Sequence, residues 1–150
     1  MAERVEAYSW GIPVRWEPNA PEAVLMSDDR GRGALAQRAH PTDPDQRCAV
    51  LRFDRLIYAH LVSINDEGLN QHRLYAAGLK DLVWLGIVRE SALVSSLRPV
   101  GMPAGEHRIQ PLHYVIASKE CVVEVIAAHI ELLRIEGPTI KAAPAALRGD

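Results

Sequence analysis

The chain has 150 residues, of which 48% are hydrophobic and 24% are charged, and its formal net charge is −2. A chain of this length and composition forms one soluble globular domain with a sizeable core and needs no disulfide. Its basic residues are scattered and no field draws it toward polyanions, so neither nucleic acid nor membrane is an expected partner.

Compartment and source follow from simple counts. The opening MAERVEAYSW is charged from its third residue and has no apolar signal region, and no run of about 18 apolar residues could span a membrane. We therefore expect a cytoplasmic protein, with Cys48 and Cys121 as reduced core thiols because each begins an apolar run. Fourteen arginines against three lysines indicate a GC-rich genome, as in actinobacteria.

The first half of the chain predicts strands separated by loops. Alternating residues from Val5 onward predict a strand that stops near Gly11 and Pro13. A short helix is predicted within 28–39, capped by an aspartate, and the prolines of 40–47 predict a loop. The apolar stretches 48–53 and 56–64 predict a β-hairpin, with Asp54-Arg55 as a turn that lacks glycine.

The second half predicts one more strand, a capped helix and a hairpin. Alternation in 81–90 favours a strand, and Ser91 is placed to cap a helix that ends near Pro99 and Gly101, followed by a loop over 101–108. Two apolar runs around Ser118-Lys119-Glu120 predict an antiparallel hairpin over 112–127, with the second strand either continuing or bulging near 127–128. We thus expect a single α+β domain over 1–137, mainly antiparallel sheet, and a Pro/Ala-rich tail over 138–150 that contributes little to the core.

Standard cofactor and metal motifs are missing from the sequence. It contains no G-x-G-x-x-G, P-loop, C-x-x-C or H-E-x-x-H motif, and its six histidines show no metal-ligand spacing on one helix. We expect no organic cofactor and no metal site.

The hairpin over 112–127 carries ionisable residues among apolar ones. Glu124 either faces solvent with Val122 and Ile126, or faces the core, where it requires a partner or an altered pKa and could serve as a general acid or base. A turn centred on 118–120 places Tyr114 opposite Glu124, and a slip of one residue would place His113 there instead. His113 and Tyr114 are therefore candidate ligand-binding residues.

The stretch SINDEGLNQHRLYAAGLK, residues 63–80, is the most polar part of the central region. Its leucines do not follow one helical face, and glycines lie near both ends, so an ordered connection between strands fits better than a regular amphipathic helix. Two interpretations stay open: the polar side chains either bind a ligand or satisfy the backbone of a long connection. In the first, the proton carriers are Asp66, Glu67 and His72, and the ligand-binding residues are Asn65, Arg73 and Tyr75.

The motif NDEGLNQHRLYAAGL, followed by HYVIASKECVVEVIA, resembles a signature of small uncharacterised bacterial proteins that end in a β-hairpin with a glutamate. The resemblance covers about 48–136 and implies no activity. This chain has Ser118-Lys119 where such proteins are expected to carry His-Asp, which argues against a catalytic turn. The residues that the resemblance marks are Asn65, Asp66, Glu67, His72, Tyr75, Gly78, His113 and Glu124.

Together these features predict a small protein that binds a small polar or anionic molecule; if it is an enzyme, an accessory or tailoring one, we expect acid/base chemistry of the lyase, isomerase, cyclase or hydrolase type. The alternative is a non-enzymatic interaction module, an immunity or regulatory partner, that uses residues 65–79 as its surface. Apolar strand edges favour a homodimer in either case.

Overall fold

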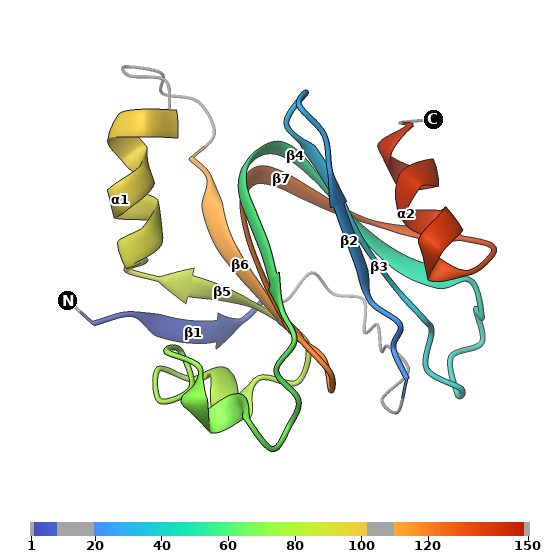
Figure 1. The fold of residues 1–150 in the computed structure, drawn as a ribbon, viewed down its shortest axis with the longest axis horizontal. Coiled ribbons are helices and arrows are strands. Elements are labelled where there is room, and N and C mark those ends of the chain that lie inside the picture. Colours follow the sequence, from blue (N-terminus) through green and yellow to red (C-terminus); the bar gives the residue numbers. More distant parts are fainter. Residues whose placement is uncertain (1, 9–19, 102–109, 149–150) are drawn as a thin grey trace.

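The computed structural model describes residues 2–8, 20–101 and 110–148, and its strands form one antiparallel sheet (Figure 1). Seven strands pair in the order β1-β5-β6-β7-β4-β3-β2. The strands are β1 (Arg4–Ala7), β2 (Val24–Ser27), β3 (Arg32–Gln37), β4 (Cys48–Val62), β5 (Leu85–Arg89), β6 (Leu112–Ala117) and β7 (Val122–Ile135). The helices are α1 (Ala92–Gly101), α2 (Thr139–Leu147) and two short 3-10 helices, η1 (Leu69–Gln71) and η2 (Leu79–Asp81). The antiparallel α+β class is thus confirmed, with sheet dominating.

The predicted hairpin over 48–64 is wrong, because this region is the single long strand β4. β4 pairs with β7 along its length, and the register shifts between Leu56 and Tyr58, where one extra residue bulges out. Arg55 adopts φ 52 beside this bulge. The similarly long β7 offers ladder partners on both sides of Asp54-Arg55, so the glycine-free pair bends the strand instead of reversing it.

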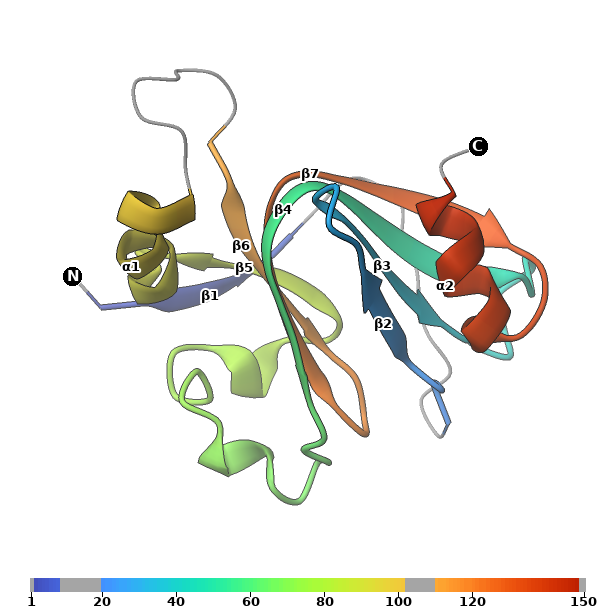
Figure 2. The same ribbon diagram turned by 45° about the horizontal axis from the view of Figure 1, so that its top comes forward.

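β4 and β7 bend near their middle, so the sheet folds into two halves that face each other (Figures 1 and 2). The main core fills the space between them. It joins Leu35 and Phe53 from one half to Ile87, Tyr114 and Val123 from the other. Burial of these side chains is the principal force that holds the bend. Among the described residues, the second half of β4 pairs only with β7, and homodimerisation through such an edge stays a prediction.

The C-terminal residues contribute to the core, contrary to prediction. α2 lies on the outer face of the β2–β3–β4 half (Figure 1), and its alanines pack against Ala34, Ala36 and Val50. Ala142 and Ala143 are fully buried. Small side chains allow the helix backbone to approach the sheet closely, and the Pro/Ala composition hid this role because it gives only a weak apolar period.

The helix predicted within 28–39 is also wrong, because β2 and β3 form a hairpin there. The Asp28 carboxylate accepts backbone N–H groups from Arg30 and Arg32, and Gly31 adopts φ 76, so the polar residues build a turn. β3 then pairs with β4. The sheet partner overrides a local sequence that lacks a strong period.

Several predicted elements are confirmed. β1 and β5 lie within the stretches where alternation indicated strands, although β5 begins only at Leu85; the loop over 40–47 has no regular structure, and the β6–β7 hairpin turns at 118–121. The Ser91 hydroxyl caps α1 by accepting the Val94 N–H at 3.0 Å. The predicted end of the first strand near Gly11 and Pro13 and the loop over 102–108 lie outside the described residues.

Candidate functional site

The connection between β4 and β5, residues 63–84, lies against part of one face of the half of the sheet that contains β1, β5 and β6 (Figure 2). It is an ordered strand-to-strand connection, as predicted, and contains the two 3-10 turns η1 and η2. Leu74 and Leu79 are fully buried and pack against Val115 and Val122 of β6 and β7. This apolar contact places His72 and Arg73, the polar residues between η1 and Leu74, over the same sheet face.

Glu124 of β7 lies on that face and is buried, with only 3% of its side chain exposed. Arg73 of the connection donates two parallel hydrogen bonds to its carboxylate, at 2.8 and 2.7 Å. His113 of β6 contacts the same carboxylate through Nε2 at 2.9 Å. The bidentate arginine pair is the strongest form of this interaction and satisfies both carboxylate oxygens.

These contacts fix the charge of Glu124. Burial would raise the pKa of its carboxyl group, but the hydrogen bonds from His113 and Arg73 outweigh burial and hold the pKa well below its ordinary 4.5. The carboxylate is therefore ionised and fully engaged. It can orient its partners and stabilise a positive charge on them.

His113 links Glu124 to a serine. Because ionised Glu124 only accepts hydrogen bonds, His113 Nε2 carries a proton, and in the neutral ring Nδ1 then accepts the Ser91 hydroxyl at 2.7 Å. Ser91 stands between β5 and α1, after Glu90 with φ 56. A continuous chain of hydrogen bonds thus runs from Ser91 through His113 to Glu124.

His72 completes the cluster on the side of the connection. Its Nδ1 accepts the Leu74 backbone N–H at 3.1 Å, so the proton of the neutral ring lies on Nε2, which faces the Glu124 carboxylate at 3.4 Å. Burial lowers the pKa of His72, although the charge of Glu124 opposes this. We define the polar cluster as His72, Arg73, Ser91, His113 and Glu124.

The structure joins only some of the predicted site residues. His72, Arg73, His113 and Glu124 come together, whereas within the described residues no side-chain hydrogen bond links the remaining candidates to the polar cluster. Asn65 instead accepts the Gly68 backbone N–H. The remaining candidates are Asn65, Asp66, Glu67, Tyr75 and Tyr114.

The predicted Tyr114–Glu124 pairing is wrong by one residue. Glu124 lies opposite Val115, and Tyr114 lies opposite Val125. Because neighbouring positions point to opposite faces, Tyr114 enters the main core between the halves, where burial raises its pKa to about 12. His113 reaches Glu124 diagonally across the two strands.

Ser91 was missed as a candidate site residue. Its sequence signal, a serine before a helical period, indicated only a cap. Its contact with His113 spans 22 positions and depends on the β5–β6 pairing, which local sequence does not specify.

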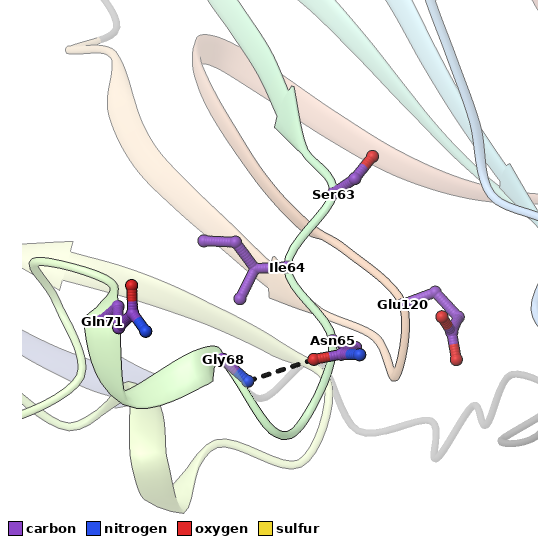
Figure 3. A pocket seen from close by; sticks show the side chains of 6 residues that line it. All are labelled: Ser63, Ile64, Asn65, Gly68, Gln71 and Glu120. Carbon is purple, nitrogen blue, oxygen red and sulfur yellow. Dashed lines mark hydrogen bonds between the residues drawn. The ribbon is translucent and has the colours of Figure 1, made fainter.

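A separate open hollow of about 320 Å³ lies at the start of the connection, where the chain leaves β4. Five lining residues come from 63–71 and the sixth, Glu120, comes from the β6–β7 turn (Figure 3). The lining residues are Ser63, Ile64, Asn65, Gly68, Gln71 and Glu120. None of them belongs to the polar cluster.

The described residues contain no group of three or more His, Cys, Asp or Glu side chains that could hold a metal ion. Within the same ranges, no helix is long and apolar enough to cross a bilayer. The sequence matches no family model, and no curated protein or solved structure is significantly similar to it. The resemblance to small bacterial proteins therefore stays a prediction.

Proposed function

We propose that the protein is a serine-dependent hydrolase that acts on a small acidic ester or amide. The observation that carries the proposal is the buried Ser91–His113–Glu124 chain, with contacts of 2.7 and 2.9 Å. Serine, histidine and carboxylate in this order form the set of groups that activates a hydroxyl for acyl transfer on unrelated folds. Among the reaction types expected from the sequence, hydrolysis is the one that these hydrogen-bonded groups support.

Each group has a defined task. Ser91 Oγ forms a bond to the acyl carbon of the substrate while its proton passes to His113 Nδ1. Glu124 accepts the His113 Nε2–H throughout and stabilises the imidazolium. The proton then passes from Nδ1 to the leaving alcohol or amine, and a water molecule, activated by the same nitrogen, hydrolyses the acyl-serine and regenerates Ser91.

Exposure and charge indicate where the substrate would approach. His113 and Glu124 are 1% and 2% exposed, whereas Ser91 retains 9% and half of the Arg73 side chain faces solvent. The reactive end of the chain is therefore its serine. Two N–H groups of the Arg73 guanidinium donate to Glu124, and a guanidinium has five. The exposed edge of this cationic group therefore favours an acidic substrate.

Covalent labelling tests the proposal without a known substrate. Purified protein is incubated with a fluorophosphonate, which phosphonylates activated serines, and the adduct is located by peptide mass spectrometry. We expect one adduct on Ser91, lost in Ser91→Ala and strongly slowed in His113→Gln. Ser96→Ala is the matched control because Ser96 is an exposed serine of α1 whose hydroxyl donates to the Leu93 carbonyl.

Locating the adduct in wild type makes the test independent of whether variants fold. An adduct on Ser96 or another exposed serine, or no adduct on Ser91 after prolonged exposure to excess reagent, would overturn the proposal. Circular dichroism of each variant separates loss of chemistry from loss of fold.

The open hollow supports a second function, an interaction surface on residues 65–79. Its rim is polar and exposed, with Asn65, Gln71 and Glu120 around it, while the polar cluster anchors the connection beneath. Hydrogen–deuterium exchange with candidate partner proteins tests this function. Protection confined to 63–71 and 118–121, with Ser91 unlabelled, would favour the interaction module over the hydrolase.

A further inference from the structure

Glu3 lies beside Ala92 at the start of α1, although 89 positions separate the two residues in sequence. β1 pairs with β5 in a register that sets Arg4 opposite Arg89, which brings the preceding residue next to the β5–α1 junction. Glu3 Oε2 accepts the Ala92 backbone N–H at 2.9 Å. The carboxylate of Glu3, the residue just before β1, thus occupies the backbone donor that directly follows Ser91.

That donor has a specific value in acyl transfer. The backbone N–H after a nucleophilic serine is well placed to stabilise the oxyanion that forms on the acyl group, and the positive end of a helix reinforces it. The Glu3 carboxylate is also close enough to Arg73 for their charges to interact. The pKa of Arg73 is raised chiefly by the hydrogen bonds to Glu124 and to a smaller degree by the charge of Glu3.

We propose that Glu3 is an autoinhibitory carboxylate, which fills the position where the substrate oxyanion or an acidic substrate group would bind beside Ser91. This inference rests on the proposed hydrolase function. Productive binding then requires Glu3 to leave Ala92. The displacement is small in extent, because β1 has four residues and lies at the edge of the sheet.

A purely structural role makes a different prediction. An acidic side chain at a helix N-terminus stabilises the helix, so its removal would lower the unfolding temperature and leave the reactivity of Ser91 unchanged. The rate of fluorophosphonate labelling at Ser91 therefore separates the two roles. Unfolding temperature alone does not.

The experiment compares labelling rates of the full chain in wild type, Glu3→Gln and Glu3→Ala, at a temperature where all are folded. One oxyanion donor is worth about 10²–10³ in rate, so freeing it should accelerate labelling by roughly tenfold or more in Glu3→Ala. Glu3→Gln, which keeps an acceptor but loses the charge, should fall between. Glu6→Ala is the control: it removes the same charge from β1, the strand that Glu3 directly precedes, but wild-type Glu6 pairs with Arg89 and Arg4 and not with Ala92.

The outcomes distinguish this inference from the function on which it rests. Equal labelling rates of Ser91 in wild type and Glu3→Ala would overturn the inference and leave the hydrolase intact. Acceleration by Glu6→Ala as large as by Glu3→Ala would also overturn it, because the effect would then be one of net charge. Absence of an adduct on Ser91 in all variants would overturn both.

Discussion

Replacing Glu124 with glutamine probes the polar cluster most directly, because it removes the charge and keeps the shape. Wild-type Glu124 accepts three hydrogen bonds of 2.7 to 2.9 Å from Arg73 and His113. Glutamine retains one acceptor oxygen and turns an amide N–H₂ toward groups that themselves donate. His113 and its neighbour Ser91 remain buried beside it.

The expected cost follows from burial. Removing one partner of a buried ion pair destabilises by about 3–5 kcal/mol. Half of the Arg73 side chain is exposed, so its guanidinium can regain water and the loss is discounted to about 2–3 kcal/mol. For a domain of this size that corresponds to a fall in Tm of about 4–12 °C.

The pH dependence gives a second, independent signature. The pKa of Glu124 is lowered in the folded state, so its ionised form stabilises the fold above the unfolded value of 4.5, and this contribution is lost as the pH falls below it. Glutamine does not titrate. The stability difference between wild type and Glu124→Gln should therefore be constant near neutral pH and narrow in acid, by at most about 1.4 kcal/mol per pH unit.

Thermal unfolding followed by circular dichroism, from about pH 7 to about pH 3.5, measures both signatures. Glu6→Gln is the matched control, because Glu6 also pairs with arginine but at the exposed surface, and we expect its Tm to stay close to wild type. An unchanged Tm for Glu124→Gln at neutral pH, or a difference that does not narrow in acid, would refute the reasoning.

Three further substitutions test the packing. Ala143→Asp should destabilise by about 3 kcal/mol or more in urea unfolding because it buries a charge, while Ile140→Asp on the exposed side of α2 should not. Gly78→Ala should lower the free energy of unfolding by about 1–3 kcal/mol, since Gly78 has φ 133 and a Cβ would lie 2.7 Å from the Val5 carbonyl oxygen. Gly137 has φ 100 but no atom within 4 Å of an added Cβ, so Gly137→Ala measures the effect of backbone strain without the steric clash. Arg134→Met should increase backbone hydrogen exchange across the loop 40–47, because Arg134 donates to three residues there, and unchanged exchange would contradict this.

The errors in the predicted fold share one cause. The β6–β7 hairpin and α1 were predictable because their turn and cap lie within a few residues of the elements they define. The region around Asp54-Arg55 became a bulged strand because β7 supplies partners beyond it. The C-terminal alanines are part of the core because their small side chains let α2 pack closely on the outer face of β2, β3 and β4. In both cases the decisive neighbour is remote in sequence.

The candidate site divides in the same way. The sequence by itself determined that Glu124 and His113 stand among apolar strand residues and that 63–80 concentrates polar groups, since residue type and spacing are local properties. Only the tertiary structure decided that Arg73 contacts Glu124 across 51 positions and that the strand register places Tyr114 on the face opposite Glu124. It also decided that the hydrogen bonds from Glu124 through His113 lead to Ser91. Strand register and the docking of a connection are set by the summed burial of many distant side chains, which no single segment encodes.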